Sequence, residues 1–181
     1  MKLWLVRHAQ PLIAPGICYG ATDVASDPQA MLAVAQALSK TLPQEVPVVS
    51  SPLARCECLA RCLQGLRPDL TYTIDARLAE MDFGHWEGRR WDSIPQADFD
   101  RWTADFSGYR FGGRTSVHEF LQRVASLWDE TLCSGIDAAW ITHAGVIRAA
   151  ILISRGERRV QKAAQWPCDA PAFGHWCELD A

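Results

Sequence analysis

Short apolar runs alternate along the chain with longer stretches in which apolar residues recur at helical spacing. Three runs are almost uninterrupted, namely Leu3 to Val6, Val46 to Val49 and Ala138 to Ile141. Such runs are typical of strands that are buried on both faces of a parallel sheet. Polar residues and then a helical pattern follow each run. The pattern therefore predicts three strand–turn–helix units.

The helices predicted after these strands span Asp27 to Lys40, Leu53 to Leu66 and Gly145 to Ser154. We expect the second helix to open with Ser51 as its N-cap and Pro52 at its first position, since both residue types favour helix starts.

A further helix is predicted from Ser116 to Leu132, because Ser116-Val117-His118-Glu119 has the spacing of a capping box. Residues 82–113 are rich in glycine and aromatic residues, and there we expect loops mixed with short helices.

The alternation of strands and helices predicts an α/β fold with three αβα layers and a mostly parallel sheet. The chain shows no repeat or long linker, so residues 1–181 are interpreted as a single domain. With 181 residues, 49% of them hydrophobic, the chain can bury a core without a metal or disulfides. Trp4, Trp128 and Trp140 lie within apolar segments and are expected in that core.

Charge and composition exclude several classes of partner. The 18 basic and 21 acidic residues give a net charge of −3, which offers no basic surface for nucleic acid. No run approaches the ~20 apolar residues that span a bilayer, so we expect a cytoplasmic protein that does not bind membranes. The seven cysteines are expected to be reduced. Cys56, Cys58 and Cys62 cluster without further ligands at metal-binding spacing, and no metal site is predicted. The oligomeric state is not indicated.

The residues that follow the predicted strands carry the candidate chemistry. Arg7-His8, the segment from Ser51 to Arg55, and Thr142-His143 come directly after the three runs. Ligands of open α/β sheets collect beyond the carboxyl ends of the strands. Guanidinium groups bind phosphate through charge-assisted hydrogen bonds, and an imidazole nitrogen can attack phosphorus. The pattern favours a small-molecule phosphomonoester as the substrate.

Four motifs in order make the chain resemble the histidine phosphatase superfamily, also called phosphoglycerate mutase-like. They are Leu5-Val6-Arg7-His8-Ala9-Gln10, Ser51-Pro52-Leu53-Ala54-Arg55, Ala79-Glu80-Met81-Asp82-Phe83-Gly84 and Thr142-His143-Ala144-Gly145-Val146-Ile147-Arg148. The resemblance implies that His8 is a nucleophile that becomes phosphohistidine and that Glu80 is the proton donor. It also implies that Arg7 and Arg55 grip the phosphoryl oxygens, that His143 completes the phosphate pocket, and that no metal or cofactor is needed.

Two departures from the family pattern concern the surroundings of the site. Ala9 and Gln10 replace the usual glycine and glutamate after the nucleophile. Gly112-Gly113-Arg114-Thr115-Ser116 stands where many members have Gly-Gly-Glu-Ser, which leaves the recognition of the leaving group open. The histidines without motif context are interpreted as surface or structural residues: His85, His118 and His175.

The segment from Gly16 to Val24 resembles the Gly-x-Cys-Tyr-Gly-x-Thr-Asp segment of α-ribazole phosphatases. That resemblance implies α-ribazole 5′-phosphate as the substrate. The substrate-binding residues would then include Cys18, Tyr19 and Gly20, with the aromatic stretch around Phe83 and Trp86. The alternatives are a phosphatase or mutase acting on sugar phosphates or phosphoproteins, and a phosphate-binding module without turnover.

Overall fold

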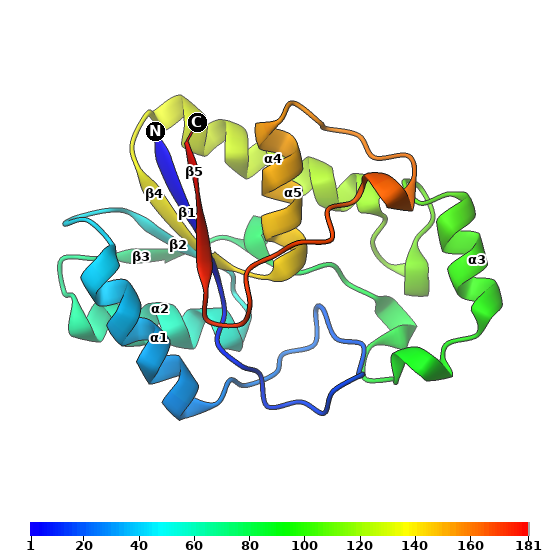
Figure 1. Ribbon diagram of the computed structural model, residues 1–181, viewed down its shortest axis with the longest axis horizontal. Coiled ribbons are helices and arrows are strands. Elements are labelled where there is room, and N and C mark those ends of the chain that lie inside the picture. The colour runs from blue at the N-terminus through cyan, green and yellow to red at the C-terminus, as the bar shows by residue number, and fades with distance from the viewer. Residues whose placement is uncertain (181) are drawn as a thin grey trace.

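A five-stranded sheet with the strand order β3-β2-β4-β1-β5 forms the centre of the computed structural model, which describes residues 1–180 (Figure 1). Its strands are β1 (Lys2–Arg7), β2 (Val48–Ser50), β3 (Tyr72–Ile74), β4 (Ala138–Thr142) and β5 (Trp176–Asp180). The first four are parallel, and β5 pairs antiparallel with β1 at one edge.

Helices cover both faces of this sheet. They are α1 (Pro28–Thr41), α2 (Ala54–Leu66), α3 (Gln96–Ala104), α4 (Val117–Ser134) and α5 (Ala144–Ser154). The pair α1 and α2 packs on one face and the pair α4 and α5 on the other, whereas α3 stands to one side (Figure 1). The three-layer, mostly parallel α/β fold predicted from the sequence is confirmed.

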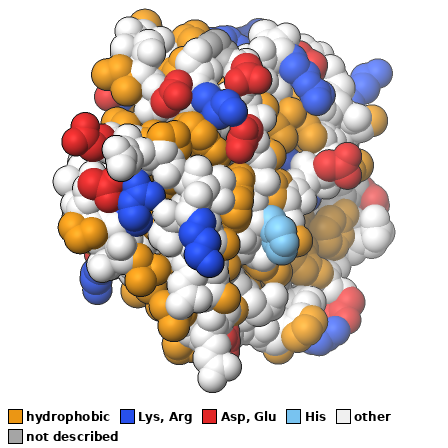
Figure 2. Space-filling view, turned by 60° about the vertical axis from the view of Figure 1, so that its left-hand side comes forward, with side chains coloured by type: hydrophobic (Ala, Val, Ile, Leu, Met, Phe, Trp, Pro, Cys, Tyr) orange, Lys and Arg blue, Asp and Glu red, His pale blue; other side chains and the backbone are white. Residues whose placement is uncertain are grey.

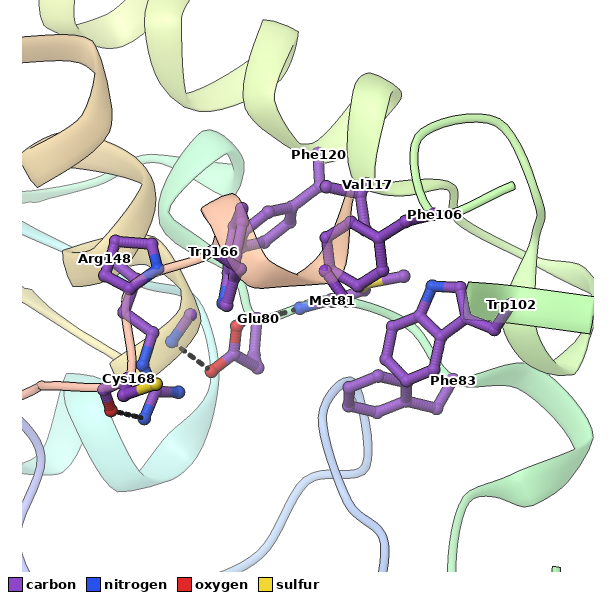
Figure 3. Close-up of a pocket in the computed structure, with 13 residues that line it drawn as sticks. Glu80, Met81, Phe83, Trp102, Phe106, Val117, Phe120, Arg148, Trp166 and Cys168 are labelled. Carbon is purple, nitrogen blue, oxygen red and sulfur yellow. Dashed lines mark hydrogen bonds between the residues drawn. The ribbon is translucent and has the colours of Figure 1, made fainter. Parts of the chain in front are cut away.

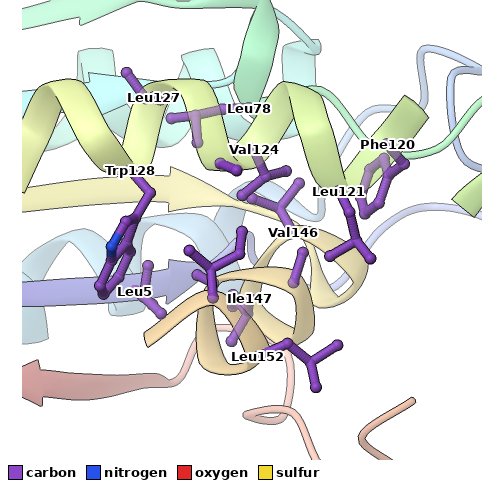
Figure 4. Packing of buried hydrophobic residues seen from close by; sticks show 14 of the residues in the cluster. Leu5, Leu78, Phe120, Leu121, Val124, Leu127, Trp128, Val146, Ile147 and Leu152 are labelled. Atoms are coloured by element: carbon purple, nitrogen blue, oxygen red, sulfur yellow. The ribbon is translucent and has the colours of Figure 1, made fainter. Parts of the chain in front are cut away.

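The period of two along β1 divides the core between the two faces of the sheet. Leu3 and Leu5 point into the cluster beneath α4 and α5, which Figure 4 shows from close by. Trp4 and Val6 point into the cluster beneath α1 and α2. Successive side chains of a strand face opposite sides, so a continuous apolar run serves both layers. The predicted burial of Trp4, Trp128 and Trp140 is confirmed.

The helix starts follow from their capping residues. The Asp27 side chain accepts a hydrogen bond from Ala30 N at 2.8 Å, and Ser116 and Glu119 form the predicted capping box. The prediction for the start of α2 was wrong. Leu53 is the N-cap, so Pro52 precedes the helix instead of opening it, and the Ser51 hydroxyl is engaged with His143. Ser51 therefore contacts a histidine of the sheet edge instead of capping the helix.

Two edge strands were not predicted. Strand β3 is three residues long with Thr73 and Ile74 exposed, and β5 carries Glu178 and Asp180, so neither has a continuous apolar run. Strand β2 begins two residues later than predicted and ends at Ser50. The stretch 82–113 contains 3-10 turns and α3, in agreement with the expectation for it.

The surface shows no concentration of one charge on the face drawn in Figure 2, where basic and acidic side chains are interspersed among apolar ones. Within residues 1–180, no helix is both long and apolar enough to cross a bilayer.

Candidate active site

The carboxyl ends of three neighbouring strands bring the predicted site residues together. Since β2, β4 and β1 are adjacent, the residues after them share one edge of the sheet. Backbone hydrogen bonds continue past the strands, from His8 N to Thr142 O at 3.0 Å and from Ser51 N to Ile141 O at 2.9 Å. A cavity of about 290 Å³ opens at this edge, and we call it the polar cavity. Its lining includes Arg7, His8, Tyr19, Arg55, Glu80 and His143.

His8 is held in one tautomer by its own backbone neighbour. Its Nδ1 lies 2.8 Å from Ala9 O, and because a carbonyl oxygen only accepts, Nδ1 carries the hydrogen. The Nε2 atom therefore keeps its lone pair. The pKa of His8 is lowered to about 3, chiefly by burial and to a lesser extent by the charges of Arg55 and Arg7, while the hydrogen bond to Ala9 opposes the shift. The imidazole is therefore neutral at physiological pH.

His143, which follows β4, forms hydrogen bonds through both of its ring nitrogens to the segment that follows β2. Arg55 Nε donates to His143 Nδ1 at 3.2 Å, so the hydrogen of this neutral ring is on Nε2. That nitrogen donates to Ser51 Oγ at 2.8 Å. Burial, followed by the charge of Arg55, holds the pKa of His143 well below its usual value. The ring lies 5.2 Å from the ring of His8, measured between centroids.

Arg7, Arg55 and Arg148 line the cavity, and none of them pairs with a carboxylate among residues 1–180. Arg55 is 1% exposed and donates to Gly20 O at 2.6 Å and to Thr22 O at 2.8 Å, besides His143. Arg7 donates to Pro171 O at 2.9 Å. Of the five N–H donors of Arg55, three are engaged and two remain for a ligand. The unpaired charges favour an anion in the cavity.

Glu87, which sequence reasoning missed, shapes the loop that holds Arg55. Its carboxylate accepts hydrogen bonds from the backbone amides of Gly20, Ala21, Thr22 and Phe83, at 2.9 to 3.1 Å, and from the Thr22 hydroxyl at 2.5 Å. Burial alone would raise the pKa of Glu87, but these hydrogen bonds outweigh it and the pKa lies below its ordinary value. In the sequence Glu87 stands only as Trp86-Glu87-Gly88 within the irregular stretch. This tripeptide has no recognisable chemistry by itself, so nothing in the sequence marked the residue.

The three residues predicted to bind substrate in the segment after Gly16 differ in their placement. Tyr19 lines the polar cavity, with its ring centroid 5.4 Å from Arg55 Cζ. Gly20 acts through its carbonyl on Arg55, and a Cβ there would meet Met81 O at 1.9 Å. Cys18 does not line the cavity. It is completely buried against aromatic residues, and burial raises the pKa of its thiol to about 12.

The prediction that Phe83 and Trp86 both contribute to the substrate site also needs correction. Trp86 packs with Phe111 in the cluster around Cys18 and lines neither the polar cavity nor its neighbour, because its indole fills the space beneath the irregular stretch. Phe83 does line the polar cavity.

Glu80 lies at the N-terminal end of α5. Its Oε2 accepts from Gly145 N at 3.0 Å and its Oε1 from Met81 N at 3.1 Å. A Cβ on Gly145 would come within 2.2 Å of Glu80 Oε1, so only glycine permits this approach. Arg123 donates to the carbonyl oxygens of Ala79 and Glu80, at 2.8 and 3.3 Å, and fixes the segment from behind.

The remaining sequence candidates lie outside the polar cavity. His85, His118 and His175 do not line it, which agrees with their interpretation as surface or structural residues. Arg114 lines a separate shallow pocket with Arg110 and Arg123. Among residues 1–180, no group of three or more His, Cys, Asp or Glu side chains is placed to bind a metal ion.

The chain belongs to the histidine phosphatase superfamily, branch 1, whose model matches residues 3–170. Fold and site thus define a phosphatase.

The chain is similar to one protein in sequence and to several in structure. "Putative phosphoserine phosphatase 2" of Hydrogenobacter thermophilus is 27% identical over 161 residues, covering 86% of this chain and 79% of that protein. The solved structure of TTHB049 from Thermus thermophilus is 28% identical with a TM-score of 0.70, covering 99% of this chain and 94% of the other. A mycobacterial glucosyl-3-phosphoglycerate phosphatase in complex with VO3 is 23% identical with a TM-score of 0.80, covering 99% and 90%.

The buried His8 predicts a pH dependence of stability. In the unfolded chain histidine titrates near 6.5, whereas in the folded protein the pKa of His8 is about 3, so between these values the unfolded state binds the extra proton. This contribution to stability is present above pH 6.5 and is lost as the pH falls toward 3. The free energy of unfolding, measured with denaturant at several pH values between 6 and 4.5, should rise with pH in the wild type. In His8→Asn its slope against pH should be smaller by up to ~1.4 kcal/mol per pH unit.

The exposed His175 provides the control for this measurement. His175→Asn should keep the wild-type slope of unfolding free energy against pH, because its side chain is exposed in the folded protein as well. The carboxylates that titrate in this pH range are common to all three proteins and contribute equally to each slope. Identical slopes in His8→Asn and wild type would show that His8 is not held neutral by burial.

The Glu87 contacts predict an effect on anion binding through Arg55. Glu87→Gln replaces the carboxylate, which accepts five hydrogen bonds, by an amide with a single acceptor oxygen, so the carbonyl oxygens that hold Arg55 lose their support. Calorimetric titration should give a Kd for inorganic phosphate about tenfold higher than in the wild type. Glu130→Gln, at an exposed ion pair with Arg77, should leave the Kd unchanged. An unaltered Kd in Glu87→Gln would separate this loop from the anion site.

Proposed function

We propose that the protein is a metal-independent phosphomonoesterase that acts through a phosphohistidine on His8. The observation that carries the proposal is the free Nε2 of a neutral, buried His8 beside two arginines without carboxylate partners. A phosphoryl group that transfers to this nitrogen needs fixed positive donors around its oxygens. Arg7 and Arg55 supply them from the protein itself.

In the first step, the Nε2 lone pair of His8 attacks phosphorus and the bond between phosphorus and the ester oxygen breaks. Glu80 gives its proton to the departing oxygen, so that the leaving group departs as a neutral alcohol. Glu80 lines the same cavity as His8 and is fixed by Gly145 and Met81. His143 completes the wall of the cavity and holds Arg55 in place, since both of its nitrogens are engaged.

In the second step, the oxygen of a water molecule attacks the phosphorus of phosphohistidine. Glu80, now a carboxylate, takes a proton from that water, and the bond between nitrogen and phosphorus returns its electron pair to Nε2. Inorganic phosphate leaves, and Glu80 is protonated for the next cycle. Dividing the hydrolysis into two displacements through a covalent intermediate makes each of them easier.

The favoured substrate is α-ribazole 5′-phosphate. The support is the resemblance of Gly16 to Val24 to the corresponding segment of α-ribazole phosphatases, together with Tyr19 at the cavity and Gly20 behind Arg55. The names of the relatives point elsewhere, to phosphoserine and to glucosyl-3-phosphoglycerate. Hydrolysis of a panel of phosphomonoesters that contains all three compounds ranks these candidates by kcat/KM.

The rival of another class is a phosphate-binding module without turnover. Such a module needs the arginines but has no use for a carboxylate fixed beside the anion site. Glu80 is fixed by two backbone amides, and a Cβ at position 145 would displace its carboxylate from this place. This arrangement favours an enzyme.

His8→Ala should abolish phosphoenzyme formation and reduce turnover to background, because the nucleophile is lost. The measurement is acid-quench trapping of radiolabelled phosphate, with p-nitrophenyl phosphate turnover in the presence of a chelator. His175→Ala, at an exposed histidine, should behave as wild type. Label that remains on histidine in His8→Ala would refute the assignment.

Glu80→Gln should slow alkyl phosphates far more than aryl phosphates, because only an alkoxide leaving group needs the proton. The expected loss is about 10²- to 10⁴-fold for ethyl phosphate and much smaller for p-nitrophenyl phosphate. Asp82→Asn is the control, since Asp82 is two residues away and lines neither of the two cavities around Glu80. Equal losses for both esters would remove Glu80 from the role of proton donor.

A further inference from the structure

A second cavity lies against the polar cavity and is of different chemical character. It has a volume of about 440 Å³, within the range of small-molecule sites. The side chains that give it its character are Met81, Phe83, Trp102, Phe106, Phe120 and Trp166, and we call it the aromatic cavity. Glu80, Phe83 and Arg148 line both cavities. The two spaces therefore meet at Glu80.

The rings of the aromatic cavity form a connected wall. Trp102 stacks on Phe106 with their centroids 5.5 Å apart, and the edge of Trp166 faces Phe106 at 6.2 Å. Phe83 meets Trp102 edge to face at 6.4 Å. Figure 3 shows Glu80 and Arg148 at one side of this space and Phe83, Trp102 and Phe106 at the other. The charged groups are thus confined to the side of the polar cavity.

We propose that the aromatic cavity receives the leaving group of the ester and that this leaving group carries a flat, uncharged aromatic ring. The inference rests on the proposed function, because Glu80 must protonate the oxygen that joins the two parts of the substrate. With phosphorus beside His8, the ester oxygen lies near Glu80, and the remainder of the substrate continues into the aromatic cavity.

The chemistry of the lining decides the class of leaving group. Flat rings gain from stacking and edge-to-face contacts with Trp102, Phe106 and Trp166, beyond the gain from apolar burial. A carboxylate placed among these rings would lose its hydration without a partner. Arg148 is the single cationic side chain of the lining, and it lies at the junction, where its Nη2 donates to Cys168 O at 2.9 Å. Small acidic leaving groups such as glycerate and serine therefore fit this site poorly.

The residues that line the aromatic cavity differ in part from those that the sequence predicted around an aromatic substrate. The rings come from Phe83, from α3 and the turn after it, from the start of α4 and from the segment 163–168, whereas the predicted partners Cys18 and Trp86 are packed elsewhere. Trp166 is half-buried, in a segment that carries no strand or α-helix. Changes at Trp166 can alter the cavity without removing a residue of the main core.

The test compares two alkyl esters whose leaving oxygens have similar basicity, 2-(2-naphthyl)ethyl phosphate and ethyl phosphate. The wild-type kcat/KM should be at least about tenfold higher for the naphthyl ester, since ring burial adds to transition-state binding. Trp166→Ala should lower this ratio about tenfold, and Trp166→Phe should keep most of it. Ala163→Trp, at an exposed position of the lining, should also lower the ratio by filling the space.

Trp176→Ala is the matched control, because Trp176 lies on β5 and packs with the cluster beneath α1 and α2. Both rates should equal those of the wild type. Hydrolysis of both esters through phosphohistidine with no preference for the naphthyl ester would overturn the inference and leave the proposed function standing.

Binding of the alcohol product separates the inference from the proposed function. Equilibrium dialysis of 2-(2-naphthyl)ethanol against the His8→Ala protein should detect binding that Trp166→Ala weakens, whether or not His8 carries the chemistry. Persistent turnover in His8→Ala would refute the histidine mechanism alone. Alcohol binding that Trp166→Ala and Ala163→Trp both leave unchanged would overturn the placement of the leaving group.

Discussion

A buried guanidinium without a carboxylate partner is the constraint on which the rest of the site depends. Removing the charge of Arg55 from water is costly unless its donors are satisfied. Carbonyl oxygens of the loop after Tyr19 and the Nδ1 atom of His143 satisfy three of the five donors without cancelling the charge. A carboxylate at this place would stabilise the free protein and compete with an anionic ligand. The loop contacts, the tautomer of His143 and the position of Ser51 all follow from keeping the cation uncompensated.

Much of the site could be predicted because parallel strands deliver it. Arg7, His8, Ser51 and His143 follow continuous apolar runs, and adjacent parallel strands end at the same edge of the sheet. Arg55 belongs to the segment after the second run, the motif resemblance added Glu80, and the structure brings both to the polar cavity. Their chemical roles are proposals that rest on this geometry.

What could not be predicted depends on contacts between segments with irregular backbone. Glu87 supports Arg55 through three backbone amides of another segment, and no local pattern marks a carboxylate that binds amides 65 to 67 residues away. The aromatic cavity has the same difficulty, since its rings come from four separate segments. The Ser51 cap failed for a related reason: a local propensity was overridden by a tertiary partner, His143. Cys18 was assigned to the substrate site through the resemblance of its segment, which does not show where a side chain points, whereas the fold buries the thiol as a small apolar group among aromatic residues.

The site is divided between the sheet edge and the outer segments, and sequence changes have different consequences in the two parts. The phosphate side is tied to strand ends, to Gly145 and to the packing of α5, so that a change there disturbs the core as well as the site. The aromatic side draws Trp166 and Ala163 from a stretch outside the strands and α-helices. Sequence drift in that stretch can exchange one substrate for another while the phosphoryl chemistry persists. Related chains with the same strand-end residues are therefore free to serve different metabolites, and a distant sequence likeness conveys the reaction far better than it conveys what is hydrolysed.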